Sequence, residues 1–497
     1  MTRVEDDVDA LMGPVLYFRG MSAGRCHLAA TLVTTDHANP ADLMVSDGGK
    51  ALPEVLATHR DLVVWRYTFS VPAGQQAARV TYAIGPQTWE VHPPPNHHLR
   101  IAFTACNGSE NDAFELGNPL RNACWRHLAR EHAKLPFHLL IQGGDQLYAD
   151  PLWQEVPYLA EWARQGRQAQ VQAPFPSHAA EAVADFYFKR YYRLWAQPDL
   201  ASLMASIPSV MMWDDHDIFD GWGSQPQALQ QCPVHQGIWQ AARKHFALFQ
   251  LGTLPEALPS GFGDPSSGHF SWAFRLGYMG IVTPDLRSAR TRERVMSEAA
   301  WRWLERTLDA MQDCQHLLLV STVPVANVML TPLERLLFWI PRQQPYQDDL
   351  RDQWQSYAHL AEWQRLVQVL LDFSEHSQTP VTILSGEIHF AAFGLLERRQ
   401  TQIFQLTSSG IVHPAPPQLA ARILDWCGRR TRAITADGHM QMLPLPLVGS
   451  RYLAARNWLT LASGPDAAIE VAWHAEGIDE ALRTHLPSSQ DAPSFSA

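Results

Sequence analysis

Six short apolar segments between residues 99 and 410 each end abruptly in small or polar residues. In chain order they are LRIAFTACNGS, FHLLIQGGDQ, IPSVMMWDDHD, HLLLVSTVPV, VTILSGEIH and QIFQLTSSG. Their apolar residues are continuous rather than alternating, which is the pattern of strands buried on both faces and covered by helices. Because open α/β folds bind ligands beyond the carboxyl ends of such strands, these polar ends are the first candidates for a functional site.

The first 92 residues follow a different pattern. Short β-rich runs such as HLAATLVTT and LVVWRYTFSV alternate with Asn-Pro, Asp-Gly-Gly and Pro-Ala-Gly turns, which predicts a small all-β, Ig-like sandwich over residues 1–92. The segment HPPPNHH follows, and its three prolines predict a stiff connector at a domain boundary. We therefore expect a second, α/β domain over residues 99–486 and a disordered tail over 487–497.

Two stretches of the α/β domain, residues 153–176 and 327–347, lack the pattern of core strands and helices. We interpret them as insertions between core elements. Long insertions in compact domains often cover a functional site, and both stretches follow strand ends that carry candidate residues.

Charge and apolar patterning exclude some classes of function. The 50 acidic residues against 39 basic ones give a net charge of -11, which disfavours nucleic-acid binding because that requires a basic surface. The amino terminus shows no signal-peptide pattern, and no uncharged apolar run reaches the roughly 18 residues of a membrane span. The six cysteines have no framework spacing. We expect a cytoplasmic protein without a membrane partner, and no obligate protein partner is evident.

Four of the strand ends carry side chains of the kinds that bind metal ions. They are Cys106 with Asn107, Asp145 with Tyr148, the DDHD run at 214–217, and Glu387 with His389. Thiolate, carboxylate, phenolate and imidazole groups together suit a mixed dinuclear metal centre.

The DDHD run is the most informative of these motifs. Three acids and a histidine directly after an apolar strand place like charges together, and buried without partners they would repel one another. A bound cation relieves that repulsion. The alternative is a solvated acidic turn or a helix cap.

The order of Cys106, GDQLY, WDDHDIFDGWG and SGEIH resembles the alkaline phosphatase D (PhoD-like) branch of the calcineurin-like metallophosphatases. A small β-sandwich ahead of the catalytic domain is part of the same resemblance. It implies a metallophosphatase-like α/β/β/α sandwich of α/β class. It also implies a metal-dependent phosphoric ester hydrolase that acts on small phosphomonoesters or phosphodiesters, with metal-bound hydroxide as the nucleophile.

The resemblance implies a role for each motif residue. Cys106, Asp145 and Tyr148 resemble ligands of an Fe(III) ion, with Asp145 bridging to a second metal. Asp215 resembles a ligand of that second metal, which is expected to be Ca²⁺, with Zn²⁺ or Mn²⁺ as alternatives. Glu387 and His389 resemble the final ligand pair, one residue for each metal.

The same resemblance implies that His216 protonates the leaving oxygen and that Asp217 orients its ring. One departure from the family pattern concerns the metals. Glu387 stands where the family usually has Asp, and the extra methylene can alter the geometry of the second metal site.

Three further residues are candidates for substrate binding. Asn107 either binds substrate or closes its turn. Arg287 and Arg290 follow an apolar strand, and either of them could bind a phosphate oxygen through its guanidinium fork. The alternative is a buried ion pair between Asp285 and Arg287, or a surface cluster.

Two other functions remain open at the level of sequence. One is a non-catalytic metal- or phosphate-binding protein on the same fold, in which the site has lost turnover. The other is a nuclease, which the net charge of -11 disfavours.

Overall fold

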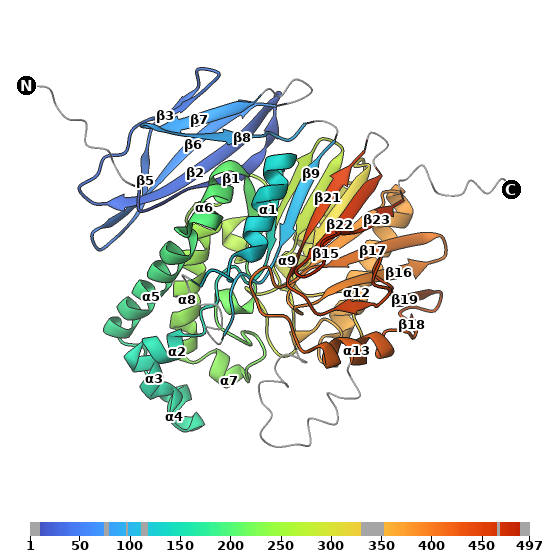
Figure 1. The fold of residues 1–497 in the computed structure, drawn as a ribbon. Coiled ribbons are helices and arrows are strands. Elements are labelled where there is room, and N and C mark those ends of the chain that lie inside the picture. The colour runs from blue at the N-terminus through green and yellow to red at the C-terminus, as the bar shows by residue number, and fades with distance from the viewer. Residues whose placement is uncertain are drawn as a thin grey trace, which may run out of the picture.

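The computed structural model describes residues 10–73, 79–95, 98–110, 118–329, 352–464 and 468–487 (Figure 1). Most of the second predicted insertion, from residue 330 to 347, lies outside these ranges. So does the predicted tail from residue 488. The first predicted insertion is described and folds into short helices that begin at Leu152.

The N-terminal strands form two facing sheets, as the sequence predicts. Phe69 of one sheet packs against Tyr82 of the other, with ring centroids 5.6 Å apart. A four-stranded sheet has the order β4-β3-β7-β8. The strands of this region are β1 (Met12–Ser22), β2 (Arg25–Thr35), β3 (Leu43–Val45), β4 (Lys50–Ala51), β5 (Glu54–His59), β6 (Leu62–Pro72), β7 (Val80–Ile84) and β8 (Gln87–Val91).

The other N-terminal sheet continues into the α/β part of the chain. β1 pairs in parallel with β11, with Tyr17 opposite Ser209. This contact produces one ten-stranded sheet in the order β23-β22-β21-β9-β10-β11-β1-β2-β6-β5. Its remaining strands are β9 (Arg100–Thr104), β10 (Leu139–Gly143), β11 (Ser209–Met212), β21 (Asn457–Ser463), β22 (Ile469–Ala475) and β23 (Leu482–Leu486). The domain division near residues 92–99 stays a prediction.

A second large sheet carries the remaining strands. Its order is β12-β13-β14-β15-β17-β16-β19-β18, and β20 pairs with β16. The run from β13 to β17 through β14 and β15 is parallel. These strands are β12 (Trp272–Leu276), β13 (Met279–Thr283), β14 (His316–Val320), β15 (Val381–Ser385), β16 (Ala391–Arg398), β17 (Thr401–Thr407), β18 (Arg432–Ala433), β19 (Gly438–Leu443) and β20 (Tyr452–Leu453).

The two large sheets pack face to face. The indole N–H of Trp272 in β12 donates to the carbonyl of Met211 in β11 at 2.8 Å. Farther along, the indole of Trp473 in β22 donates to the carbonyl of Thr407 in β17 at 3.0 Å. The metallophosphatase-like fold class predicted from sequence is thus confirmed, and its central strands β9, β10, β13, β14 and β15 are buried along their whole length.

Helices cover the outer faces of the sheets (Figure 1). α9 and α12 share a hydrophobic cluster with the second large sheet, and α6 contacts β1 of the first. The described helices are α1 (Ala123–Lys134), α2 (Leu152–Glu155), α3 (Pro157–Ala163), α4 (Arg167–Gln172), α5 (Ser177–Trp195), α6 (Pro198–Ser206), α7 (Gln227–Gln230), α8 (Pro233–Phe249), α9 (Glu298–Asp309), α12 (Leu360–Ser377) and α13 (Gln418–Cys427), with short 3-10 turns at Asp215–Asp217 and Pro265–Ser267. No helix in the described ranges has the length and apolarity that crossing a bilayer requires.

A buried histidine in β14 makes the stability of the fold depend on pH. The Nε2 atom of His316 lies 2.9 Å from Thr382 Oγ1, and burial lowers the pKa of His316 to about 3. Below a pH of about 6.5 the unfolded chain binds a proton here that the folded chain excludes. Stability is therefore lost as the pH falls from about 6.5 toward 3, with a contribution from this residue of up to about 1.4 kcal/mol per pH unit.

We predict that His316→Asn reduces this loss. Urea midpoints measured at pH 6.5, 5.5 and 5.0 should fall less steeply in the variant than in the wild type. His37→Asn is the matched control, because the His37 side chain is 93% exposed. Parallel slopes for His316→Asn and the wild type would contradict the prediction.

Candidate metal centre

The strand ends that carry the candidate residues meet at one edge of the two large sheets. Cys106, after β9, joins both sheets through its backbone. Its N–H donates to the carbonyl of Gly144, after β10, at 3.1 Å, and its carbonyl accepts the N–H of Val412, after β17, at 3.2 Å. The candidate ligands are therefore brought together by strand pairing that continues past the ends of the strands.

Four of the predicted ligands have a left-handed backbone. The φ angles are +58° for Cys106, +57° for Asp145, +65° for Glu387 and +58° for His389. This conformation costs a residue with a side chain roughly 1 kcal/mol or more, and it persists only where the surroundings impose it. The edge of the sheets thus holds strain at the residues that the sequence singles out.

Cys106, Asp145 and Tyr148 form one compact group. Cys106 Sγ lies 3.4 Å from Asp145 Oδ2 and 3.1 Å from the hydroxyl of Ser409. The Asp145 Oδ1 atom and the Tyr148 hydroxyl are buried, and neither has a hydrogen-bond partner among the described residues. Burial holds the pKa of Asp145 well above its usual range. The nearby charge of His216 opposes this shift, and like charges that include Asp214 add to it.

His216 stands beside this group. Its Nδ1 atom lies 2.8 Å from Asp150 Oδ2, its Nε2 atom lies 3.4 Å from Glu110 Oε1, and its ring stacks on Tyr148 with centroids 4.2 Å apart. Burial acts to lower the pKa of His216, but the charges of Asp150 and Asp215 outweigh it and raise that pKa well above its usual value.

Two sets of side chains bring their ligand atoms within 4.8 Å of one another. One set is Asp145, Asp215 and His216, and the other is Glu110, His389 and His413. In the second set the rings of His389 and His413 stack, with centroids 3.4 Å apart and an interplanar angle of 9°. Burial holds the pKa of His389 well below its usual value, and the charge of His413 acts in the same direction. A neutral imidazole is the form that binds a metal ion.

The Glu387 carboxylate is held by the side-chain amide of Gln353, which lies ahead of α12 in the chain. Gln353 Nε2 donates to its Oε1 at 2.9 Å and its Oε2 at 3.0 Å. Burial, and then the charges of Asp352 and Asp214, raise the pKa of Glu387 well above its usual range. The Glu387 side chain is half-buried and makes no ion pair with Arg or Lys among the described residues.

Asp217 differs from its expected role. The resemblance implies that Asp217 orients the His216 ring, but the carboxylate that contacts the imidazole is that of Asp150. Asp217 is fully buried and accepts the backbone N–H groups of Asp145 at 3.0 Å and Leu147 at 2.9 Å. Burial raises the pKa of Asp217 to about 7, although hydrogen bonds from the backbone N–H groups of Asp214 and Leu147 oppose the shift. Asp217 therefore stabilises the loop that carries Asp145 and Leu147.

Arg287 and Arg290 lie in buried ion pairs. The Arg287 guanidinium contacts Asp214 and Asp352 closely and lies 3.3 Å from Asp215. Arg290 Nε lies 2.9 Å from Asp352 Oδ1. Burial alone would raise the pKa of Asp352, but the charges of the two arginines hold it at about 2. Both guanidinium groups thus face carboxylates, and their predicted binding of phosphate stays a prediction.

The ion pair considered between Asp285 and Arg287 takes a different form. The Asp285 carboxylate accepts the backbone N–H of Arg287 at 2.9 Å and the indole N–H of Trp213 at 3.0 Å. Asp285 therefore closes a turn, and the Arg287 side chain is free to reach the acids after β11.

Asn107 is held by aromatic and backbone contacts. Its Oδ1 atom accepts the indole N–H of Trp125 at 2.8 Å, and its Nδ2 atom lies 3.5 Å from the carbonyl of Gln146. These contacts close the turn after β9. Its predicted role in substrate binding stays a prediction.

Three residues of the site were missed in the sequence. Asp150 follows the GDQLY motif by two positions, so its closeness to Asp145 could have signalled it. Glu110 and Gln353 stand in segments with no recognisable pattern, and only the fold brings them to the other ligands.

The side chains present fit a pair of metal ions. Asp145 Oδ1 and the Tyr148 hydroxyl are buried without partners, and the carboxyls of Asp145 and Glu387 resist ionisation without a cation. Native proteins rarely leave such groups unsatisfied unless an ion or another ligand completes them. The donor set of thiolate, phenolate, carboxylate and imidazole suits a mixed dinuclear metal centre.

Comparisons with known proteins agree with the fold and with the family resemblance. Residues 101–340 match the family model of PhoD related phosphatases, so the resemblance seen in the sequence is confirmed for the segment that carries Cys106, Asp145 and the DDHD run. Two solved structures share the fold. PhoD superposes over 96% of this chain and 89% of its own with a TM-score of 0.58 and 13% identity. Purple acid phosphatase PPD1 from yellow lupin seeds superposes over 95% of this chain and 73% of its own, with a TM-score of 0.51 and 10% identity.

A curated relative is similar in sequence over much of the chain. It is the Saccharomyces cerevisiae protein "Uncharacterized protein YGR266W", 24% identical over 470 residues. The match includes 74% of this chain and 65% of the relative, so this chain spans slightly less than two thirds of that protein's length.

We predict that metal binding and stability are coupled through Asp145. Without metal, Asp145→Asn should be at least as stable as the wild type, because it removes a buried charge among like charges. With metal present, the wild type should gain stability and the variant should gain much less. Thermal melting with and without a chelator, alongside elemental analysis, measures both effects.

The control for this experiment is Asp479→Asn, an exposed acid in the turn after β22. It should respond to metal as the wild type does. A wild-type protein whose melting temperature and metal content are unchanged by the chelator would contradict the prediction.

Proposed function

We propose that this protein is a metal-dependent phosphoric ester hydrolase whose substrates are small phosphoesters. The observation that carries the proposal is the convergence of Cys106, Asp145, Tyr148 and Asp215 on one buried cluster with unpartnered oxygen atoms, beside His216, whose Nδ1 atom contacts Asp150. The match of residues 101–340 to PhoD related phosphatases supports the same reaction class.

The proposed centre holds two cations. Cys106, Asp145 and Tyr148 would bind Fe(III), Asp145 and Asp215 would bind a second ion such as Ca²⁺, and Glu387 and His389 would add one ligand to each. When bound, the pair supplies an activated water near neutral pH and disperses the negative charge of the phosphoryl group.

His216 is the proposed proton donor to the leaving oxygen. The contact between its Nδ1 atom and Asp150 fixes the ring and stabilises the imidazolium. Nε2 is then the atom that carries the transferable proton. Stacking on Tyr148 keeps the ring plane beside the cluster. Asp150 acts through His216 and is a positioning residue.

The proton-donor role predicts a dependence on the leaving group. A phenolate such as p-nitrophenolate leaves without a proton, whereas an alkoxide requires one. We expect His216→Asn to lower kcat for an alkyl phosphate by roughly 100-fold or more and for p-nitrophenyl phosphate by less than about 10-fold. Steady-state kinetics on both esters measures the difference.

Asp150→Asn should also lower kcat more for the alkyl phosphate than for p-nitrophenyl phosphate, by a smaller factor than His216→Asn. It should move the alkaline limb of the pH profile of kcat to lower pH. The control is Glu155→Gln, an exposed acid in the nearby α2 helix. Equal losses on the two esters in His216→Asn, with metal content intact, would assign His216 a role other than proton donation.

The identity of the metals is tested by spectroscopy. A phenolate bound to Fe(III) gives a charge-transfer absorption in the visible range, so Tyr148→Phe should lose that band. Elemental analysis should find iron with a second metal in the wild type. Tyr187→Phe serves as control, since Tyr187 is a buried tyrosine whose hydroxyl donates to the carbonyl of Ile218. A band that persists in Tyr148→Phe would exclude this phenolate as a ligand.

A further inference from the structure

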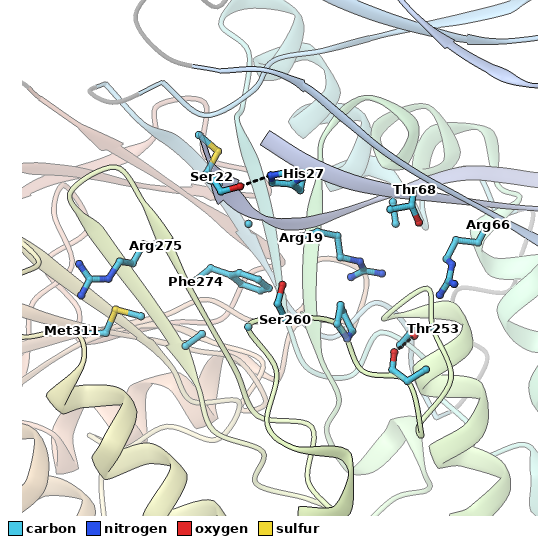
Figure 2. Close-up of a pocket in the computed structure, with 17 residues that line it drawn as sticks. Arg19, Ser22, His27, Arg66, Thr68, Thr253, Ser260, Phe274, Arg275 and Met311 are labelled. Atoms are coloured by element: carbon cyan, nitrogen blue, oxygen red, sulfur yellow. Dashed lines mark hydrogen bonds between the residues drawn. The ribbon is translucent and has the colours of Figure 1, made fainter. Parts of the chain in front are cut away.

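A cavity of about 740 Å³ lies where the N-terminal sheet meets the second large sheet (Figure 2). Its walls come from β1, β2 and β6 on one side, from β12 on another, and from the loop that follows α8. None of the candidate metal ligands lines it. It is therefore separate from the metal centre and is not explained by the proposed reaction.

Arg66 of β6 lines this cavity and brings a guanidinium group to it. Its Nε atom is buried and has no hydrogen-bond partner among the described residues. Its Nη2 atom lies 3.1 Å from Glu54 Oε2, and the Glu54 side chain is 60% exposed. The Arg66 side chain is 28% exposed, and an anion in the cavity would give its guanidinium a second acceptor besides Glu54.

Arg19 of β1 brings a second guanidinium to the same cavity. It donates to the backbone carbonyls of Leu251 and Gly252, and it has no carboxylate partner in the described part of the chain. Burial, and also the nearby charge of Arg66, lower the pKa of Arg19 to about 10. The cavity thus gathers two positive charges that repel each other, in a protein whose net charge is -11.

The rest of the lining suits an organic molecule. In Figure 2, the Arg19 side chain lies between Arg66 and the ring of Phe274. Met21 and Phe274 provide apolar surface, while Thr68 and Ser260 provide hydroxyl groups. A cavity of this volume, with apolar walls and a few converging polar groups, is typical of small-molecule sites.

We propose that this cavity binds a small organic anion, with a carboxylate or phosphate group between Arg19 and Arg66 and an apolar body against Phe274. The anion neutralises the paired guanidinium charges and accepts hydrogen bonds from the N–H groups that reach the cavity. This binding is independent of the proposed hydrolysis, because the two sites share no residue.

The test uses the full chain loaded with metal and three naphthalene probes of similar shape. They are 2-naphthoate, 2-naphthylphosphonate and the neutral 2-naphthamide, and their affinities are measured by calorimetry. We expect at least one of the two anions to bind with an affinity about 10-fold or more above that of the amide, because only an anion neutralises the two guanidinium charges. Equal affinities for all three probes, or no binding by either anion, would overturn the proposal.

The residue test compares two arginines of the N-terminal strands. Arg66→Gln should weaken binding of the anion by about 10-fold or more. Arg25→Gln removes the same charge from an arginine that pairs with Asp47 at 2.8 Å and does not line the cavity, so it should change affinity by less than about twofold. Similar losses in the two variants would mean that net charge alone attracts the anion, and the proposal would fail. Arg19 is not the primary test because its carbonyl contacts also hold the loop.

A last variant separates this site from the metal centre, which also attracts oxyanions. Asp145→Asn should bind the anion with unchanged affinity, even if it binds no metal. Loss of anion binding in that variant would place the anion at the metal centre and overturn the cavity assignment. Retained binding together with absent hydrolysis in the wild type would sustain this inference and reject the proposed function.

Discussion

The buried carboxylate of Asp217 is the constraint on which the candidate centre depends. One of its oxygens accepts the backbone N–H of Asp145 and of Asp214, and the other accepts that of Leu147. A buried carboxylate surrounded by backbone donors ties the ends of β10 and β11 together. The left-handed backbone of Asp145 is imposed by this arrangement, because its own local preference is against it.

The acids around the centre are divided into two groups by their partners. Asp214 and Asp352 face the guanidinium of Arg287, so the protein neutralises them itself. Asp145 and Glu387 have no such partner among the described residues, and burial raises their pKa. The fold thus places an arginine beside the acids on one side of the cluster, and the acids on the other side require a bound metal ion to neutralise them.

The N-terminal strands are connected to the centre through the end of α8. The Tyr17 hydroxyl in β1 donates to the carbonyl of Phe249 at 2.7 Å, and the adjacent Gln250 donates to Asp217 Oδ1 at 2.6 Å. The parallel pairing of β1 with β11 adds a backbone connection at the same place. The N-terminal sheet is therefore part of the scaffold that supports the metal-ligand loops.

The sequence by itself determined the fold class and the motifs that carry Cys106, Asp145 and His216. It could do so because continuous apolar strands and clustered acids are local patterns, readable without knowing the neighbours of a residue. It did not reveal the pairing of β1 with β11, because strand pairing between distant segments leaves no local pattern.

Tertiary structure alone decided which group supports which ligand. In the folded chain, His216 contacts Asp150 rather than Asp217. Glu110 and Gln353 lie at the centre. The Arg287 side chain contacts Asp214 and Asp352. Tertiary structure also placed Arg19 and Arg66 at one cavity from separate strands. The physical reason is the same in each case: hydrogen bonds and charge pairs depend on distances between side chains, and packing sets those distances between segments far apart in the chain.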